Sequence, residues 1–308
     1  MAKHYLSLQP LIPWRQMNHP LDWQNLFGRT TSLEVEIGFG NGERLLRHAR
    51  SHPEVNLVGV DLSWPAARRA LRKIALAQAD NVLLVLASAE AALARLFAPN
   101  SLNSVEALFP CPWPGVRHQR RRLFSRRFLA MLNNRLADGA TFHMVTDHEN
   151  FFKWVLSQLP KEGFRVETGV RGPGLETKYE RKWCGEGQDE FHELWLTKTR
   201  HLKNPPMEDI VLQALRLKNF DQAAVQNRDY HEQAFISFKE LVFDPQKAKG
   251  LLHVVVSEDD FLQAFWLEFR QADNGWLLRP TLGCGLVPTK GVRRAMELAA
   301  NLAEGRFI

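Results

Sequence analysis

Cysteine is scarce in this chain of 308 residues, and the three that occur lie far apart, at positions 111, 184 and 284. No two of them have the C-x-x-C spacing of zinc or redox motifs, and an odd, scattered set does not support a disulfide framework. The histidines show no metal-ligand spacing either, so no metal site is expected. These absences favour a reduced, cytoplasmic compartment.

Long apolar runs are also missing. No stretch approaches the ~18 consecutive apolar residues that a membrane-spanning helix needs. The N-terminal stretch is interrupted by Lys3, Pro10, Pro13 and Arg15, so it lacks the apolar core of a signal peptide. No membrane association is expected. With 45% hydrophobic and 24% charged residues, the composition is that of a folded globular protein.

Charge is distributed unevenly along the chain. Lys and Arg number 40 and Asp and Glu 34, which gives a net charge of 40 − 34 = +6. Residues 1–204 hold 28 basic and 20 acidic side chains (+8), whereas residues 205–308 hold 12 and 14 (−2). A basic surplus indicates an acidic partner, and here it belongs to the first two-thirds of the chain.

The first two-thirds alternate between predicted strands and helices. Expected strands are 33–37, 55–61, 81–87, 104–109 and 140–146, and expected helices are 43–51, 65–79, 89–97, 123–136 and 149–159. Asp138-Gly139 is expected to end the fourth helix. Such alternation predicts a doubly wound, mostly parallel α/β sheet of the Rossmann-like kind, with 191–197 as a late edge strand.

Asn204-Pro205-Pro206 breaks this pattern and is the predicted linker. Beyond it, the segments 235–243, 251–257, 261–271 and 275–282 are predicted strands, and 288–303 is a predicted helix. We therefore expect two domains, residues 1–204 and a smaller α+β domain of residues 205–308. The second domain contains no recognisable motif.

A glycine-rich loop follows the first predicted strand, where Glu36 precedes Gly38, Gly40 and Gly42. A dinucleotide fingerprint needs glycine three positions after Gly40, and this chain has Glu there. Asp61 ends the next strand, where a carboxylate can bind ribose hydroxyls. The combination suits S-adenosylmethionine, which has no pyrophosphate. The alternative is a glycine turn with solvated acids.

A proline-rich loop, residues 109–114, follows the fourth predicted strand, where an open parallel sheet binds its ligands. Trp113 offers a face on which a base can stack, although a stiff loop around a packed Trp is equally compatible. Residues 117–127 then hold six arginines and no acid. This cluster favours RNA phosphates over a merely solvated helix face.

Two further polar groups lie near predicted strand ends. Asp147 closes the fifth strand, and Thr177 and Glu180 lie in a polar segment before the last strand. Carboxylates can accept hydrogen bonds from the N1–H and N2–H groups of guanine. The alternatives are an ordinary strand-end Asp and a T-x-x-E helix cap.

Together these motifs resemble the tRNA (guanine-N7)-methyltransferase family over roughly residues 33–200. The landmarks are Glu36–Gly42, Asn81-Val82, Phe109-Pro-x-Pro-Trp-Pro114, Arg117-His118, Arg120–Arg122, Thr146-Asp147 and Thr177-Lys-Tyr-Glu180. The resemblance implies a Rossmann-like class I methyltransferase fold, S-adenosyl-L-methionine as cofactor, and methylation of guanine N7 in the variable loop of tRNA.

The resemblance also implies roles for individual residues. Cofactor-binding residues would be Glu36, Gly38, Gly40, Asp61 and Ser88. Substrate-binding residues would be Trp113, Arg117, Arg120, Arg121, Asp147, Thr177 and Glu180. Asp147 and Cys111 are the catalytic candidates.

Asp61 stands where the family usually has Glu, and three further departures from the family matter more. Cys111 stands where the family has Asp, Gly115 where it has Lys, and Ser88 where it has Asp. Guanine N7 carries its own lone pair and can attack the methyl group without a general base, so positioning is the main requirement. Two alternatives stay open: a catalytically degenerate RNA-binding protein, and a methyltransferase with another acceptor. Residues 205–308 could support a homo-oligomer or bind a protein partner.

Overall fold

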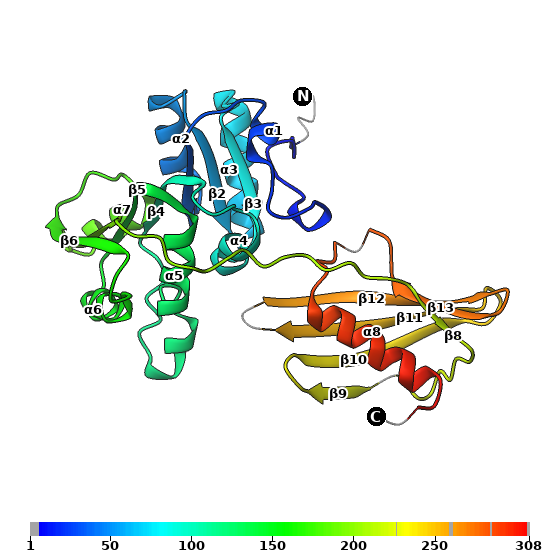
Figure 1. Ribbon diagram of the computed structural model, residues 1–308. Helices are drawn as coiled ribbons and strands as arrows, with labels where there is room; N and C mark the ends of the chain where they lie inside the picture. The colour runs from blue at the N-terminus through cyan, green and yellow to red at the C-terminus, as the bar shows by residue number, and fades with distance from the viewer. Residues whose placement is uncertain (1–5, 226, 259–260, 284, 307–308) are drawn as a thin grey trace. The chain divides into compact units, whose positions relative to one another are not determined.

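The computed structural model describes residues 6–225, 227–258, 261–283 and 285–306, so Cys284 lies outside the described residues. The chain splits into two compact units (Figure 1). The first takes in residues up to Trp14 together with His19–Met207, and the second takes in Arg15–Asn18 and the chain from Glu208 onward. The chain therefore passes from the first unit to the second just after the Pro205-Pro206 pair.

The first unit is built on a seven-stranded sheet with the order β3-β2-β1-β4-β5-β7-β6. Its strands are β1 (Leu33–Ile37), β2 (Asn56–Asp61), β3 (Val82–Leu86), β4 (Leu102–Leu108), β5 (Leu136–Thr146), β6 (Phe164–Arg171) and β7 (Phe191–Lys198). β1 to β5 pair in parallel, while β7 runs antiparallel to both β5 and β6. The predicted Rossmann-like, mostly parallel α/β sheet is confirmed.

Helices connect these strands. They are α1 (Trp23–Phe27), α2 (Glu43–Ser51), α3 (Trp64–Ala77), α4 (Ala89–Arg95), α5 (Arg126–Arg135), α6 (Glu149–Gln158) and α7 (Lys178–Gly185), with 3-10 turns η1 (Trp14–Gln16) and η2 (Val116–Arg121). α2 and α3 bury alanine and leucine side chains against β2 and β3. This packing fixes the start of α2, and with it the glycine loop, relative to the sheet.

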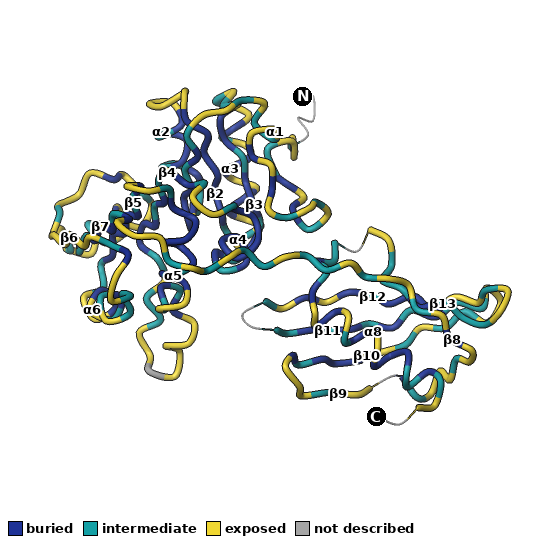
Figure 2. Tube along the Cα trace, viewed as in Figure 1, coloured by how far each residue is buried: buried dark blue, intermediate teal, exposed yellow. Residues whose placement is uncertain are grey.

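One predicted strand has a different place in the sheet. Residues 191–197 were expected at the edge, but β7 lies between β5 and β6, and β6 is the edge strand. β6 was missed because its interior residues are exposed and it contains no buried apolar alternation (Figure 2). An edge strand exposed on both faces leaves no hydrophobic period to read.

The helix expected over 123–136 is shorter. It begins after Ser125, whose hydroxyl accepts the backbone N–H of Phe128, and it ends at Arg135. Asp138-Gly139 does not end it, because these residues lie within β5, where Gly139 has a φ of 78°. A glycine in the left-handed region allows an irregular step inside a strand, so the same dipeptide marks a strand irregularity here.

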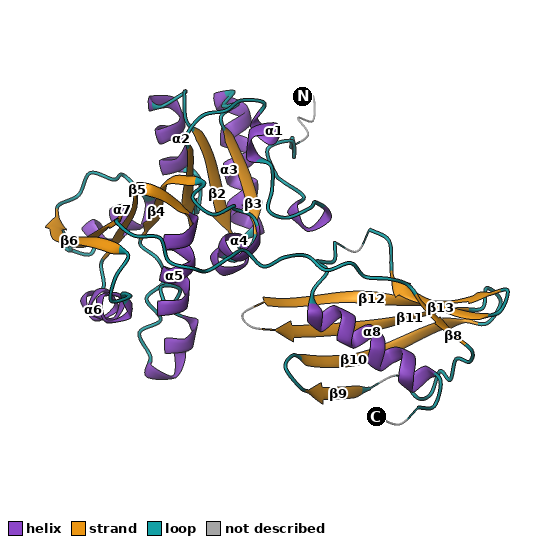
Figure 3. Ribbon diagram, in the orientation of Figure 1, coloured by secondary structure: helices purple, strands orange, loops and turns teal. Residues whose placement is uncertain are grey.

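The second unit is a six-stranded antiparallel sheet with the order β8-β13-β12-β11-β10-β9. The strands are β8 (Leu215–Leu217), β9 (Arg228–His231), β10 (Phe235–Asp244), β11 (Lys249–Glu258), β12 (Phe261–Ala272) and β13 (Gly275–Pro280). One helix, α8 (Lys290–Ala303), lies across the sheet and packs on β8, β10, β11 and β13 (Figure 3). The four long strands and the helix were predicted. β8 and β9 were not, because segments of three or four residues carry too short a pattern.

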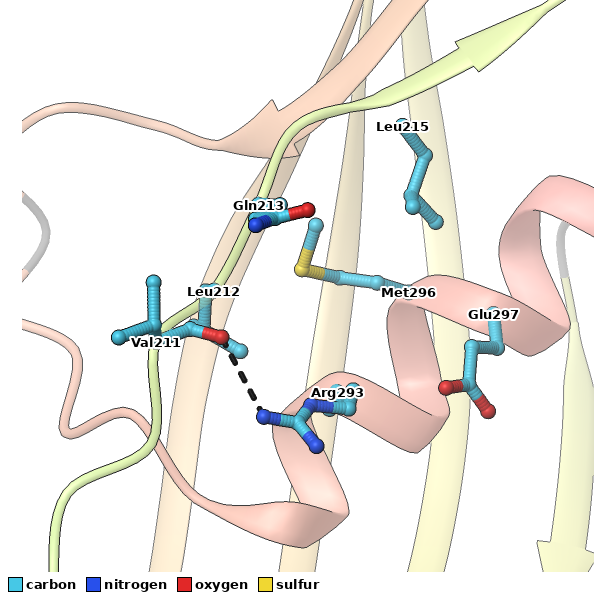
Figure 4. A pocket seen from close by; sticks show the side chains of 7 residues that line it. All are labelled: Val211, Leu212, Gln213, Leu215, Arg293, Met296 and Glu297. Atoms are coloured by element: carbon cyan, nitrogen blue, oxygen red, sulfur yellow. Dashed lines mark hydrogen bonds between the residues drawn. The ribbon is translucent and has the colours of Figure 1, made fainter.

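A pocket of about 360 Å³ opens within the second unit, between the segment leading to β8 and α8. Figure 4 shows its lining side chains, which are Val211, Leu212, Gln213, Leu215, Arg293, Met296 and Glu297. Arg293 closes one side by donating to the Val211 carbonyl at 3.3 Å. No residue predicted for the functional site lines this pocket. Within the described part of the chain, no helix has the length and apolarity needed to cross a bilayer.

Candidate active site at the carboxyl edge of the parallel sheet

The glycine loop joins β1 to α2 in a conformation that requires glycine. Gly38, Gly40 and Gly42 have φ angles of 75°, 54° and 75°, which side chains with a Cβ rarely adopt. A Cβ at Gly42 would also lie 2.8 Å from the Cβ of Ala70 on α3. Gly42 is the N-cap of α2 and has no side chain to cap it. The Asn41 side-chain oxygen instead accepts the Glu43 N–H at 3.2 Å, so one N–H of the first turn is already bound and the start of α2 offers an anionic group only the N–H groups that follow.

Asp61, the last residue of β2, binds this loop directly. One carboxylate oxygen accepts the Gly40 N–H at 3.0 Å, and the other accepts the Ser63 N–H at 2.8 Å. A carboxylate has about four acceptor positions, so each oxygen keeps capacity for a further donor. The structure thus brings Asp61 and the glycine loop together, as the pattern predicted. It leaves the carboxylate able to bind hydroxyl groups.

Glu36 lies on β1 just before the loop and is 8% exposed. Burial, with the neighbouring carboxylates of Glu106 and Asp61, raises its pKa to about 8. Glu36 is therefore protonated at neutral pH in this state. A cation placed beside it would favour the ionised form and reverse that shift.

A partly buried network of hydrogen bonds and ion pairs runs across the sheet beside Glu36, and the sequence did not predict it. His143 on β5 contacts Glu106 on β4 at 3.1 Å through Nδ1, and Glu193 on β7 at 2.8 Å through Nε2. Arg44 on α2 binds both oxygens of Glu106, at 2.9 and 3.2 Å, and Arg171 on β6 binds Glu193 at 3.1 Å. The network therefore joins α2 to the strands on the far side of the sheet.

The network has an electrostatic consequence for Glu106. Burial would raise the pKa of this carboxyl, but hydrogen bonds from His143 and Arg44 outweigh burial and hold its pKa at about 2. Charged residues within otherwise apolar strands are rare unless they are paired. The acid in β4 and the histidine in β5 were the signals that could have revealed the network.

Ser88 follows β3 and begins α4, and its hydroxyl accepts the Ala91 N–H at 3.1 Å. It is thus a helix cap at the same edge of the sheet as Asp61. A cofactor role for Ser88 stays a prediction.

The proline-rich loop after β4 is held in a strained conformation. Phe109 and Trp113 have φ angles of 51° and 43°, which are uncommon for residues other than glycine. Such strain costs about 1–3 kcal/mol per residue and is concentrated at functional sites. Cys111 lies exposed between them.

Arg122 holds this loop in place. Its guanidinium donates to the carbonyl oxygens of Pro112 at 3.1 Å and Trp113 at 3.3 Å, and it stacks 5.1 Å from the Trp154 ring centroid. Arg122 is only 7% exposed, so it does not belong to an exposed phosphate-binding cluster as the sequence suggested. Arg122 is buried because its guanidinium donates hydrogen bonds to loop carbonyl groups that would otherwise lack a partner inside the fold.

The arginines of η2, unlike Arg122, lie on the surface. Arg117, Arg120 and Arg121 are exposed, and the guanidinium of Arg121 lies 5.0 Å from the centroid of the Trp113 ring. The positive charge and the exposed side of the loop therefore lie next to each other. This is the arrangement expected of a surface that binds single-stranded or looped RNA.

Asp147 follows β5 and is half-buried. Its backbone carbonyl accepts from the Gln188 side chain at 2.9 Å. That bond fixes the backbone at the end of the strand and leaves the carboxylate for other donors.

Thr177 and Glu180 form the helix cap that was the alternative interpretation. The Thr177 hydroxyl accepts the Glu180 N–H at 3.1 Å. The Glu180 carboxylate is 3% exposed and accepts backbone N–H groups from Gly174, Leu175 and Glu176. Glu180 therefore organises the turn that precedes α7, and its contact with a guanine stays a prediction.

These groups share one edge of the sheet. The glycine loop, Asp61, Ser88, the proline-rich loop and Asp147 follow β1, β2, β3, β4 and β5, whose carboxyl ends point the same way (Figure 1). The strand order 3-2-1-4-5 reverses between β1 and β4. Open α/β sheets bind their ligands at such a reversal.

Comparison with known proteins identifies the family. Residues 30–193 match the family described as "Putative methyltransferase". A tRNA (guanine-N(7)-)-methyltransferase of Chlorobium phaeobacteroides is 40% identical over 172 residues, covering 56% of this chain and 84% of that protein. The protein of the same name from Thermotoga maritima is 33% identical over 287 residues, covering 87% of this chain and 88% of that protein.

A third protein of that name, from Aquifex aeolicus, is 24% identical over 301 residues, covering 94% of this chain and 98% of that protein. The two longer alignments must extend into the second unit, because that unit makes up about a third of the chain. By the matched family, the extent of these alignments and the site geometry, the chain belongs to the tRNA (guanine-N7)-methyltransferase family.

Proposed function

We propose that this protein transfers a methyl group from S-adenosyl-L-methionine to N7 of a guanine in the variable loop of tRNA. The observation that carries the proposal is the meeting of two loops at the β1/β4 reversal. The glycine loop with Asp61 lies on one side of it, and the Trp113 loop with its exposed arginines lies on the other. One loop suits a nucleoside cofactor and the other suits RNA.

The residues present fit S-adenosylmethionine. Asp61 retains acceptor positions for ribose hydroxyls, and the glycine loop at the start of α2 lets a ligand approach the backbone closely. Glu36 is a buried carboxyl that needs a nearby cation to ionise, which suits the ammonium group. The bound cofactor would supply an electrophilic methyl group on a sulfonium.

The protein's task toward the guanine is to position it. N7 has a lone pair, so no side chain must remove a proton before transfer, and the family aspartate replaced by Cys111 is not needed as a base. Trp113 would stack on the base, and the Asp147 carboxylate would accept from its N1–H and N2–H groups. Thr177 and Glu180 would complete this side, with Glu180 mainly shaping the turn.

Phosphate contacts are assigned to Arg117, Arg120 and Arg121, which are exposed on η2, and the Arg121 guanidinium lies over the Trp113 ring. We place the reaction in the cytoplasm. Residues 205–308 are the candidate surface for self-association or for a protein partner.

The test is methyl transfer from labelled S-adenosylmethionine to bulk unmodified tRNA, followed by nucleoside analysis. Label in 7-methylguanosine is the expected result. Cofactor and tRNA binding without label would instead support a degenerate RNA-binding protein, which the replacement of the family aspartate by Cys111 makes the second candidate. Label in another nucleoside would indicate a different acceptor. An Asp61→Ala variant, with Asp80→Ala as the exposed control, should lose transfer through loss of cofactor binding.

A further inference from the structure

The helix that leaves the glycine loop is fastened to the segment that carries Thr177 and Glu180. Arg47 on α2 donates to the Leu175 carbonyl at 2.9 Å and to the Glu176 carbonyl at 3.3 Å. The same guanidinium pairs with the Glu176 carboxylate at 3.1 Å. One side chain of the cofactor-side helix thus makes three contacts with a turn about 130 residues later in the chain.

A second arginine makes the reciprocal connection. Arg181 on α7 donates to the carboxylate of Glu43, the first residue of α2, at 2.6 Å. It also donates to the Glu176 carbonyl at 2.7 Å. Lys73 on α3 binds the other oxygen of Glu43 at 3.1 Å. The Arg181 and Lys73 hydrogen bonds outweigh burial and lower the pKa of Glu43 to about 2, so this carboxylate stays ionised at neutral pH.

Hydrogen bonds also connect the residues of the turn that these arginines contact. The Glu180 carboxylate accepts hydrogen bonds from the backbone N–H groups of residues 174, 175 and 176, and Thr177 caps α7. Fixing Leu175 and Glu176 therefore also fixes the residues assigned to the guanine. Arg47 and Arg181 are about a third to a half exposed, so solvent screens their ion pairs and these pairs contribute little to folding.

We propose that Arg47 and Arg181 are positioning residues that couple the cofactor side of the site to the guanine side, so that cofactor and tRNA bind cooperatively. The inference rests on the proposed function. A ligand that orders the start of α2 also orders the turn fastened to it, and the second ligand then loses less conformational entropy on binding. The coupling is reciprocal, so either ligand can be varied to measure it.

The experiment measures tRNA dissociation constants with and without saturating S-adenosylhomocysteine, which cannot donate a methyl group. For the full-length wild-type protein we expect at least about a fivefold tightening, the lower end of ordinary coupling. In Arg47→Met and Arg181→Met the factor should fall to near one, while Arg181→Lys should recover part of it. Arg165→Met is the matched control. The substitution removes the same charge, but Arg165 pairs with Glu167 on the exposed strand β6, away from α2 and the turn before α7.

Three results would overturn the inference: a factor near one in the wild-type protein, an unchanged factor in both variants, or a lost factor in Arg165→Met. An unchanged factor with tRNA affinity lowered equally in both conditions would show that the arginines only contact phosphates. Thermal unfolding of each variant verifies that it is folded. Failure of the wild-type protein to bind or methylate tRNA would refute the proposed function itself, and that outcome is distinct from a lost or retained coupling factor.

Discussion

Glu36 is a buried carboxyl whose protonation links the candidate cofactor site to the pH dependence of stability. In the fold it is buried on β1, opposite Glu106 on β4, and its pKa rises from 4.5 to about 8. The folded protein therefore keeps a proton that the unfolded chain loses above pH 4.5. Stability from this group is fully present below pH 4.5 and is lost as the pH rises through 8.

We expect Glu36→Gln to remove this pH dependence. Between pH 5 and 8 the wild-type free energy of unfolding should fall relative to the variant by up to about 1.4 kcal/mol per pH unit. Urea unfolding of both proteins in the absence of cofactor measures the difference, with Glu167→Gln on the exposed strand β6 as control. Parallel stability curves for wild type and Glu36→Gln would contradict the protonated assignment.

Asp147 should affect turnover more than cofactor binding. Its carboxylate is assigned to the guanine, and a hydrogen bond to a charged group contributes about 1.5–3 kcal/mol, or roughly a ten- to hundredfold effect. Asp147→Ala should therefore lower kcat/KM for tRNA by that factor while the Kd of S-adenosylmethionine changes less than about twofold. Equal losses in both quantities would rule out the base-holding role. Asp80→Ala, also a loop aspartate, serves as the control.

Cys111 is exposed, and no step of the proposed reaction needs a nucleophile from the protein, because guanine N7 itself attacks the methyl group. Cys111→Ala should keep activity, and Cys111→Asp, which restores the family residue, should keep or raise it. Initial rates of methyl transfer measure this. An abrupt loss in both variants would show that the thiol has a role of its own.

Among the elements, the proline-rich loop depends on one buried guanidinium. Arg122→Met removes hydrogen bonds to two loop carbonyls and should cost about 1–3 kcal/mol of stability, because the carbonyls lose their partner. Arg120→Met, two residues earlier on the same turn, should change stability by less than about 0.5 kcal/mol. It should lower tRNA affinity and reduce the salt slope by about one instead. Denaturant unfolding and tRNA titration at several salt concentrations distinguish the two variants. A destabilised Arg120→Met, or an Arg122→Met that lowers only tRNA affinity, would contradict the assigned roles.

The elements divide into those with local signals and those without. β1 and α2 were predicted to the residue, because alternating apolar side chains, glycines and a helical apolar face lie within a few positions of each other. β6 has no such pattern, and β8 and β9 are too short to show one. For the same reason the glycine loop and Asp61 could be joined from spacing alone.

The contacts between distant segments could not be predicted. His143, Glu106 and Glu193 are separated by 37 and 50 positions, and only the strand order makes them neighbours. The same holds for Arg122, whose arginine neighbours in the sequence face solvent while it is buried. The sequence shows which residues are polar, but the order of the strands in the sheet determines which polar side chains contact one another.

In the molecule as a whole, the first unit carries both the excess positive charge and the residues assigned to the active site. The +8 of residues 1–204 includes the exposed arginines beside Trp113, while residues 205–308 carry −2. The family match ends at residue 193, yet relatives from Thermotoga maritima and Aquifex aeolicus align over most of the chain. The second unit therefore recurs among relatives of the family, although its charge makes it a poor independent clamp for RNA.

The most direct test removes the proposed acceptor atom. Two tRNA transcripts are compared, one with guanosine and one with 7-deazaguanosine at the variable-loop position, where a C–H replaces N7. The guanosine transcript should accept one labelled methyl group at that nucleotide, and the 7-deazaguanosine transcript should accept none there while binding with similar affinity. Equal methylation of both transcripts would show that guanine N7 is not the acceptor and would contradict the proposed reaction.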